Sequence, residues 1–411
     1  MSKKYIVVLI DGASDYPLAE LGNKTPLQAA DKPVIDMLAR CGTVGMVKTI
    51  PHGVAPGSDS ANLSILGYDP RVYSTGRSSL EAVSMGIKLS ENDVTFRCNL
   101  VTLSDENNYP EKIMLDYSAG EITTEEAKIL INDMAQVLQT DQIRFYPGVS
   151  YRHIIVWRNG IGEIDDTLIL TPPHDISGRK IADYLPKGKS SSVFLDFMLK
   201  SGLILKDHPL NAKRIKEGKK PANSIWIWAK ALKPALGSFY EKYGINGSVI
   251  SAVDLVKGIG ICAGLKPVDV KGATGNIHTD FEGKARAALN ELKNGRDFVY
   301  IHIEAPDECG HQGNVSEKIR AIELIDNKVI RILKEQLDLM KIQYSMMILP
   351  DHPTPIIKRT HTSDPVPFLI YDSKDAGAGN SSNIYDEFYP KTNGVFISEG
   401  HKLMDYFLSK T

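Results

Sequence analysis

The sequence predicts an α/β protein in which a doubly wound sheet is interrupted by a smaller α+β unit. Continuous β-branched runs, such as residues 5–10, are typical of parallel strands buried on both faces. These runs alternate with helical segments in residues 1–85 and again in residues 190–411, whereas residues 86–189 carry shorter strands with polar alternation. We therefore expect one discontinuous domain, 1–85 with 190–411, and one inserted domain, 86–189.

In the first segment, the strand 5–10 ends at Asp11 and Gly12. A helix is expected over 33–40, with a proline near its first position and Gly42 after its end. A second strand is expected near 45–50. Gly57 then begins a turn that leads into a helix running to about residue 66.

The middle segment predicts strands at 96–103, 112–117 and 151–158. Its clearest helix is 123–138, which Thr123 or Thr124 caps and whose first turn carries Glu125 and Glu126. The third segment predicts helices at 191–200, 254–263 and 314–337, and strands at 224–228, 248–253, 297–303, 344–349 and 367–371. Between them, residues 213–220 predict a basic surface loop.

The composition limits the classes of function. Forty-two per cent hydrophobic and 24% charged residues are typical of a globular protein, and the net charge of −2 argues against coating nucleic acid or an acidic membrane. The four cysteines form no CxxC pair, which suits a reducing compartment. No apolar run has the length of a membrane span, and 5–10 is too short for a signal-peptide core, so we expect a cytoplasmic protein.

Metal-ligand residue types follow three of the buried strands. Asp11 ends the first strand, Asp307 and His311 follow the strand 297–303, and Asp351, His352 and His361 follow or lie beyond the strand 344–349. Functional groups gather at the carboxyl ends of strands in a doubly wound sheet, and Asp with His suits Mn, Zn, Co or Mg. Any one of these aspartates could be a turn residue, but together they predict a metal cluster.

Ser58 follows Gly57 and lies just before the expected helix, whose dipole and N-terminal backbone N–H groups favour an anion at this position. A metal beside its hydroxyl would make it a nucleophile. The alternative is a simple helix cap, a role that Asp59 and Ser60 could also fill, and Ser60 is the rival nucleophile.

In combination, these motifs resemble the cofactor-independent (2,3-bisphosphoglycerate-independent) phosphoglycerate mutases of the archaeal type, in the alkaline phosphatase superfamily. The resemblance spans nearly the whole chain. It is carried by Leu9-Ile-Asp-Gly12, Gly57-Ser-Asp-Ser-Ala61, Phe96-Arg-Cys-Asn99, Tyr151-Arg-His153, Pro173-His-Asp-Ile-Ser-Gly-Arg179, residues 250–260, Gly272-Ala-Thr-Gly275, Glu304-Ala-Pro-Asp-Glu-Cys-Gly-His311, Pro350-Asp-His-Pro353 and Thr360-His-Thr362.

The resemblance implies interconversion of 2-phosphoglycerate and 3-phosphoglycerate in glycolysis and gluconeogenesis, through a phosphoserine at Ser58 and without bisphosphoglycerate. It implies two divalent metal ions, Mn, Mg, Co or Zn. The implied ligands are Asp307, His311 and His361 for one ion, and Asp11, Asp351, His352 and the Ser58 oxygen for the other.

The remaining roles implied by the resemblance concern the substrate, a small phosphorylated acid. Lys257 is expected to contact the phosphoryl group. The inserted domain is expected to grip the glycerate and to shuttle protons through Asp175, His153 or His174. Its implied residues are Arg97, Arg152, His153, His174, Asp175 and Arg179.

Two departures leave the substrate open. Asn62 stands where relatives often carry histidine, and residues 226–232 contain less glycine than expected. The alternatives are a homoserine kinase-like phosphotransferase, a phosphatase acting on another small phosphorylated metabolite, or a non-catalytic metal-binding protein with the same fold.

Overall fold

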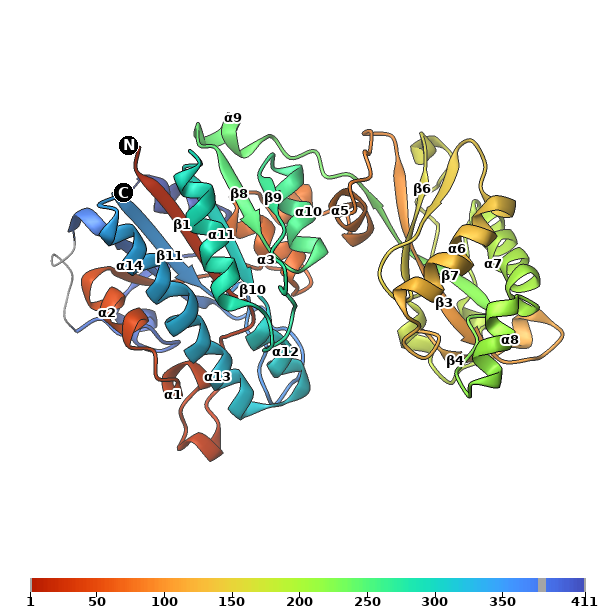
Figure 1. Cartoon of the computed structure of the whole chain (residues 1–411), viewed down its shortest axis with the longest axis horizontal. Coiled ribbons are helices and arrows are strands. Elements are labelled where there is room, and N and C mark those ends of the chain that lie inside the picture. Colours follow the sequence, from red (N-terminus) through yellow and green to blue (C-terminus); the bar gives the residue numbers. More distant parts are fainter. Residues whose placement is uncertain (1, 376–381, 410–411) are drawn as a thin grey trace. The chain divides into compact units, whose positions relative to one another are not determined.

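The computed structural model describes residues 2–375 and 382–409, and the chain forms two compact units. Unit 1 is made of two segments, Met1–Ser74 and Ala235–Thr411, and unit 2 is the intervening segment Thr75–Pro234 (Figure 1). In the described part of the chain, no helix has both the length and the apolar character needed to cross a membrane.

Unit 2 is larger than the expected insertion 86–189 at both ends. Strand β7 (Ser224–Leu232) pairs antiparallel with β3 (Val94–Leu103), so its backbone hydrogen bonds belong to the sheet of unit 2. Helix α7 (Ser191–Lys206) packs on α6 (Thr124–Leu138) and on β7. The expected boundary at residue 189 was therefore wrong. The pattern of the sequence changes near that residue, but the sheet of unit 2 is complete only once β7 has joined it.

The sheet of unit 1 has eight strands in the order β13-β2-β12-β11-β1-β10-β8-β9. Strand β1 pairs in parallel with both β10 and β11, whereas β12 runs antiparallel to β11 and β2. The expected α/β class with a doubly wound sheet is confirmed, although the sheet is mixed and not wholly parallel. The strands are β1 (Lys4–Ile10), β2 (Thr43–Val47), β8 (Gly247–Ile250), β9 (Lys266–Val268), β10 (Phe298–Ile303), β11 (Tyr344–Leu349), β12 (Val366–Asp372) and β13 (Val395–Ile397).

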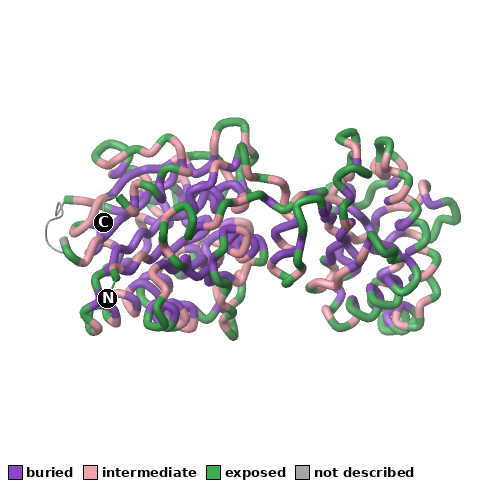
Figure 2. Tube along the Cα trace, turned by 90° about the horizontal axis from the view of Figure 1, so that it is seen from above, coloured by how far each residue is buried: buried purple, intermediate pink, exposed green. Residues whose placement is uncertain are grey.

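Helices surround this sheet, and β1, β10 and β11 are buried throughout or almost throughout their length (Figures 1 and 2). The main helices of unit 1 are α1 (Pro26–Ala29), α2 (Pro33–Cys41), α3 (Ser58–Ile65), α4 (Pro70–Tyr73), α9 (Phe239–Tyr243), α10 (Asp254–Cys262), α11 (Phe281–Lys293), α12 (Ala305–Gln312), α13 (Val315–Ile325), α14 (Arg331–Leu339), α15 (Tyr389–Asn393) and α16 (Leu403–Ser409).

The helix expected over 314–337 contains a π-helical turn, Asp326–Ile330, between α13 and α14. The buried Asp326 carboxylate accepts hydrogen bonds from the backbone N–H groups of Val34, at 3.3 Å, and Ile35, at 2.7 Å. Helix α2 has no side-chain cap of its own, so this residue of the π turn satisfies donors at its N-terminus.

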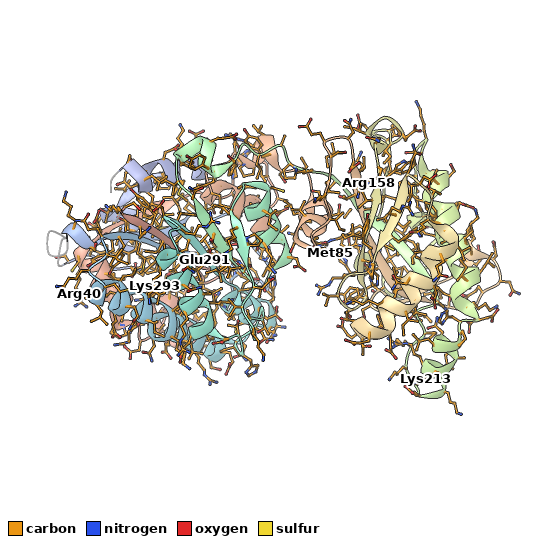
Figure 3. The ribbon with its side chains drawn as sticks, turned by 45° about the horizontal axis from the view of Figure 1, so that its top comes forward. Arg40, Met85, Arg158, Lys213, Glu291 and Lys293 are labelled. Atoms are coloured by element: carbon orange, nitrogen blue, oxygen red, sulfur yellow. The ribbon has the colours of Figure 1, made fainter. Side chains whose placement is uncertain are left out.

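The sheet of unit 2 contains β4 (Met114–Asp116), β3, β6 (Arg152–Trp157) and β5 (Ile143–Tyr146), with β7 on β3. Phe194 of α7 packs against Phe96 of β3, with ring centroids 4.8 Å apart, which joins helix and sheet in one core. The first half of the basic stretch expected as a loop belongs to helix α8 (Pro209–Lys216), from which Lys213 projects outward (Figure 3), and its second half, 217–220, is not helical. Helix α5 (Arg77–Ser84) begins the unit.

Candidate active site

The candidate site of unit 1 lies at the carboxyl ends of three adjacent parallel strands. Asp11 directly follows β1, and its backbone N–H donates to Ile303 at the end of β10, at 3.0 Å. Asp351 follows β11, and α12 after β10 carries Asp307. Because β11, β1 and β10 are neighbours, their ends bring these three carboxylates to one edge of the sheet.

Asp307, His311 and His361 form the first group of converging donors. Asp307 and His311 are four residues apart on α12, so they share one face of the helix. Nε2 of His311 lies 3.3 Å from Asp307 Oδ2, and Nε2 of His361 lies 3.5 Å from Asp307 Oδ1. Burial acts to raise the pKa of Asp307, but its contacts with His311 and His361 hold that pKa well below the usual value.

Asp11, Asp351, His352 and Ser58 form the second group. Nε2 of His352 lies 3.3 Å from Asp351 Oδ2, 3.7 Å from Asp11 Oδ1 and 3.1 Å from the Ser58 hydroxyl. One oxygen of Asp307 also lies close enough to share a centre with Asp11 and His352. The geometry thus brings together all seven residues expected as metal ligands.

The electrostatics of these groups fit divalent cations. Burial, followed by the nearby carboxylates of Asp351 and Asp307, raises the pKa of Asp11 well above its usual value. Among the described residues, no hydrogen-bond partner reaches the buried Asp11 Oδ1. Crowded buried carboxylates and an unpaired oxygen are stabilised by a bound cation, and carboxylate with imidazole is a donor set for Mn, Zn or Co.

The two candidate serines differ in their surroundings. Ser58 is the first residue of α3, and its hydroxyl points to His352. The hydroxyl of Ser60 is buried and bonds to the backbone carbonyls of Ala55, at 3.1 Å, and Gly57, at 3.0 Å. These bonds occupy Ser60 with the local backbone, so the geometry favours Ser58 as the nucleophile.

Asn62, one of the two departures from the family pattern, lies inside the site. Its amide nitrogen donates to the Ser58 carbonyl oxygen at 2.8 Å and to Asp351 Oδ2 at 3.2 Å. The Tyr300 hydroxyl in turn donates to Asn62 Oδ1 at 2.7 Å. Asn62 therefore links the candidate nucleophile to a candidate ligand, a role that the sequence analysis missed.

Two other buried residues beside the ligands were also missed. His302 of β10 contacts Asp11, and the hydroxyl of Thr354 contacts the carboxylate of Asp307. A sequence signal existed for His302, because it is the one charged or imidazole residue in the apolar run of β10. Thr354 follows the Asp351–Pro353 motif without such a signal.

Lys257, expected to contact the phosphoryl group, lies on α10, which packs against α3. Its ammonium group donates to Asp269 at 2.7 Å. The side chain of Asp269 is largely exposed, so water screens this ion pair and the ammonium group is not locked by it.

In unit 2, aromatic rings connect three of the expected substrate-binding residues. The Arg97 guanidinium lies over the Trp228 ring, 4.8 Å from its centroid, and His174 packs edge-on against the same ring at 5.3 Å. Tyr117 continues the cluster from His174 to Tyr151, and Arg152 lies over Tyr151 at 5.5 Å. Asp175 is exposed beside His174, with 3.6 Å between its Oδ1 and His174 Nε2.

Two expected substrate residues lie differently. The side chain of His153 is buried on the sheet face it shares with Cys98, and its Nδ1 accepts a hydrogen bond from Gly148 N–H. Burial lowers the pKa of His153 to about 3. This burial disfavours the expected role of His153 in gripping substrate or shuttling protons, and strand alternation places it on the face opposite Arg152. Arg179 is exposed and donates to the Tyr184 hydroxyl at 3.0 Å.

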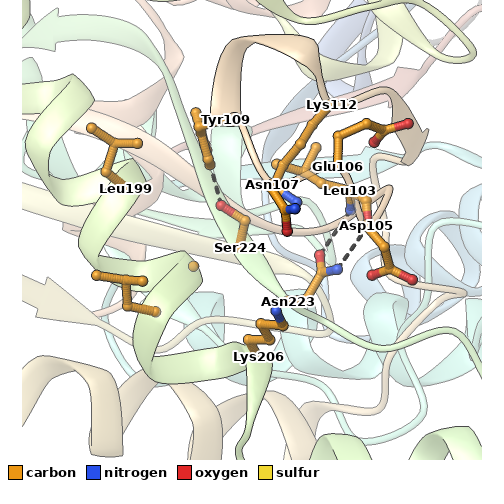
Figure 4. A pocket seen from close by; sticks show the side chains of 12 residues that line it. Leu103, Asp105, Glu106, Asn107, Tyr109, Lys112, Leu199, Lys206, Asn223 and Ser224 are labelled. Carbon is orange, nitrogen blue, oxygen red and sulfur yellow. Dashed lines mark hydrogen bonds between the residues drawn. The ribbon is translucent and has the colours of Figure 1, made fainter.

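A separate pocket of about 220 Å³ in unit 2 lies between α7 and the chain around Asn107 (Figure 4). Tyr109 and Ser224 share a hydrogen bond at its wall, and the Asn223 amide bonds to both backbone groups of Leu103. Leu199 and Lys206 also line this pocket, and none of the expected site residues does.

Comparisons with known proteins agree with these motifs. Residues 39–211 match the family model described as 2,3-bisphosphoglycerate-independent phosphoglycerate mutase. A protein of Geobacter sulfurreducens named as a probable member is 48% identical over 99% of this chain and 100% of its own length. A Methanosarcina mazei enzyme of the same name is 49% identical over 98% of both chains.

Solved structures give the same result for the fold. A protein from Pyrococcus horikoshii superposes with a TM-score of 0.82 at 27% identity, over 100% of this chain and 98% of its own. A cofactor-independent phosphoglycerate mutase from Thermoplasma acidophilum gives a TM-score of 0.68 at 25% identity, over 100% of both chains. With near-complete coverage at almost half identity, the chain belongs to the 2,3-bisphosphoglycerate-independent phosphoglycerate mutases.

Proposed function

We propose that this protein interconverts 2-phosphoglycerate and 3-phosphoglycerate through a phosphoserine at Ser58, in glycolysis and gluconeogenesis and without bisphosphoglycerate. The observation that supports this most is the position of the Ser58 hydroxyl, at the first residue of α3 and 3.1 Å from His352 in the carboxylate–histidine cluster. Family membership supplies the substrate class, and this geometry supplies an acceptor for the phosphoryl group.

Two divalent ions belong to the proposal. Asp307, His311 and His361 would hold one. Asp11, Asp351, His352 and the Ser58 oxygen would hold the other. When bound, such ions supply positive charge that lowers the pKa of a serine hydroxyl and neutralises phosphoryl oxygens.

The chain's own groups perform the transfer in two displacements. The Ser58 Oγ attacks phosphorus and loses its proton, while the bond from phosphorus to the substrate oxygen breaks and that oxygen takes up a proton. The glycerate then presents its other hydroxyl, which loses its proton as its oxygen attacks phosphorus, while the bond from phosphorus to Ser58 Oγ breaks and Ser58 Oγ takes up a proton. The N-terminus of α3 favours the phosphorylated state because its backbone N–H groups face the anion.

The remaining groups handle charge and protons. Lys257 adds a cation for the phosphoryl oxygens, and Arg97 and Arg152 match the glycerate carboxylate, because a guanidinium pairs with a carboxylate through two parallel hydrogen bonds. Arg179 is a further cation for the substrate. His174 and Asp175, both exposed, are the favoured candidates for proton transfer, and the burial of His153 disfavours it for that role.

The test uses the purified protein with Mn²⁺ and 3-phosphoglycerate, without bisphosphoglycerate, and follows 2-phosphoglycerate. We expect turnover that chelation abolishes, no turnover in Ser58→Ala, and a phosphopeptide containing Ser58. Ser60→Ala is the matched control and should retain turnover, because its hydroxyl serves the backbone of the same turn. Release of inorganic phosphate alone, or transfer from ATP to homoserine without mutase activity, would contradict the proposal.

We place the enzyme in the cytoplasm. The free thiols of Cys41, Cys98, Cys262 and Cys309 support this location, as does a substrate that belongs to central carbon metabolism.

A further inference from the structure

Buried beside the ligand cluster, His302 connects three neighbouring strands. It lies in β10, where it pairs in register with Leu9 of β1, two residues before Asp11. Its Nε2 lies 2.9 Å from Asp11 Oδ2, and its Nδ1 lies 3.2 Å from the hydroxyl of Ser251, which follows β8. His302 is wholly excluded from water, so these two contacts define its environment.

The chemistry of the partners fixes the proton on the ring. A carboxylate that binds a cation is ionised and only accepts hydrogen bonds, so in the metal-bound state Nε2 carries the hydrogen that it donates to Asp11. Nδ1 is then an acceptor for the Ser251 hydroxyl at 3.2 Å, and the Val253 carbonyl oxygen at 3.3 Å is the other acceptor within reach of that hydroxyl. Ser251 is itself held, because its oxygen accepts from the Val253 N–H at 3.0 Å. The chain of donors therefore runs from Val253 through Ser251 and His302 to Asp11.

One oxygen of Asp11 is consequently occupied and the other is not. Oδ2 accepts from His302, whereas the buried Oδ1 has no hydrogen-bond partner among the described residues and faces His352 Nε2 at 3.7 Å. A carboxylate held by one oxygen cannot turn freely about its last bond. We propose that His302 is a positioning residue that holds Asp11 Oδ2 so that Oδ1 is presented to the divalent ion. This inference rests on the metal site of the proposed function.

The competing role for His302 is direct ligation. Its donor atoms converge with those of Asp11 and Asp351 closely enough to surround an ion. Ligation through Nε2 would, however, require loss of the 2.9 Å contact to Asp11, and Nδ1 is directed to Ser251. Lys284 also donates to the His302 carbonyl oxygen at 3.1 Å, which puts an ammonium group near this side of the cluster and disfavours another cation there.

The test compares His302→Gln and His302→Leu by titrating metal-free protein with Mn²⁺, using calorimetry and electron paramagnetic resonance. Glutamine keeps an N–H donor near the position of Nε2, and leucine removes it. We expect His302→Leu to weaken Mn²⁺ binding about 10- to 100-fold, as removal of a hydrogen-bond partner of a ligand typically does, and His302→Gln to restore most of that loss. Ser251→Ala should weaken binding in the same direction, by less than His302→Leu.

Two measurements keep the outcome decisive. The unfolding midpoint of each metal-free variant shows whether it folds; if His302→Leu does not, Ser251→Ala and His302→Gln carry the comparison. Equal Mn²⁺ affinity in the wild type, His302→Leu and Ser251→Ala would overturn the proposal. A ¹⁴N coupling to bound Mn²⁺ that disappears in His302→Gln would also overturn it, because it would make His302 a ligand.

Asp11→Asn separates this inference from the proposed function. If Asp11→Asn leaves Mn²⁺ binding unchanged, the proposed metal site itself is wrong. If Asp11→Asn weakens binding while the His302 variants do not, the metal site stands and only the positioning role fails.

Discussion

Lys318 and Asp15 form an ion pair in which both side chains are wholly excluded from solvent, with Nζ and Oδ2 2.6 Å apart. Lys318 also donates to the Thr354 carbonyl oxygen at 2.8 Å, and the Asp15 carboxylate accepts from the Ile356 N–H. The pair therefore connects α13 to two loops, one after β1 and one after β11. The first loop starts at Asp11 and the second contains Asp351 and His352, which are expected metal ligands.

Removal of one member of this pair should destabilise the fold strongly. Lys318→Met leaves the Asp15 charge buried without its cation, and we expect the free energy of unfolding to fall by about 3–5 kcal/mol. Urea denaturation of the metal-free protein measures the loss.

The double variant Lys318→Met/Asp15→Asn provides the control. It removes both charges while the asparagine oxygen can still accept the Ile356 N–H, so it should be more stable than Lys318→Met alone. A double variant less stable than the single one would show that the lysine acts by packing and not by pairing.

Arg97 should contribute to substrate affinity through its fixed orientation. The Glu81 carboxylate binds Nε, at 2.8 Å, and Nη2, and the guanidinium lies on Trp228, which leaves Nη1 and the second N–H of Nη2 for the glycerate carboxylate. In Arg97→Lys the planar fork is lost, and we expect kcat/KM for 3-phosphoglycerate to fall about 10- to 100-fold, mainly as a higher KM.

Steady-state kinetics test this expectation, with Arg144→Lys as the matched control. Arg144 is a partly exposed arginine of β5 in the same unit, paired only loosely with Asp141 at 3.8 Å. An unchanged KM in Arg97→Lys would place the carboxylate contact elsewhere in the cluster.

The ligands could be predicted from the sequence because strand periodicity and strand ends are local features. The apolar runs that became β1, β10 and β11 are immediately followed by, or lie close to, Asp11, Asp307 and Asp351, and parallel pairing brings such ends together. A metal cluster at the sheet edge therefore followed from three short stretches of chain.

What the sequence did not reveal depends on long-range contacts. Strand β7 joins the sheet of unit 2 by pairing with β3, more than a hundred residues earlier, and no local pattern announces that partner. The same holds for Lys318, which looks like a surface lysine until Asp15 is placed against it. The burial of His153 could not be predicted either, because the face it occupies depends on its register with Cys98.

Ala229 is a position where a substitution should stabilise the protein. It has a φ of +54°, in the left-handed region that costs an L-residue about 1–2 kcal/mol, next to the register shift between β3 and β7. It lies in the stretch 226–232 that contains less glycine than the family pattern leads one to expect. We expect Ala229→Gly to raise the free energy of unfolding by about 1 kcal/mol, measured by urea denaturation.

Ala231→Gly is the control for that variant. Ala231 is a buried residue of the same strand whose φ is not positive, so glycine there should lower stability by about 0.5–1 kcal/mol through lost packing and greater freedom of the unfolded chain. Equal effects of the two substitutions would show that the φ of Ala229 carries no strain.

Glu387 should make stability depend on pH. Its carboxylate accepts hydrogen bonds from the Asp15 N–H, at 3.1 Å, and the Thr25 hydroxyl, at 2.7 Å, and burial of the carboxyl group raises its pKa from 4.5 to about 7. Between pH 4.5 and 7 the folded protein keeps a proton that the unfolded chain has released. The free energy of unfolding should therefore fall as pH rises through this window, by at most ~1.4 kcal/mol per pH unit from this group, and the contribution should level off above pH 7.

Glu387→Gln isolates this contribution, because glutamine resembles the protonated acid: its oxygen can accept from Asp15 N–H and its amide can donate to Thr25. Urea denaturation at several pH values should show the wild type losing stability relative to Glu387→Gln from pH 4.5 to 7, with a constant difference at higher pH. Parallel stability curves for the two proteins across this range would mean that Glu387 is already ionised in the folded state at low pH. Its two hydrogen bonds would then outweigh the cost of burying the charge.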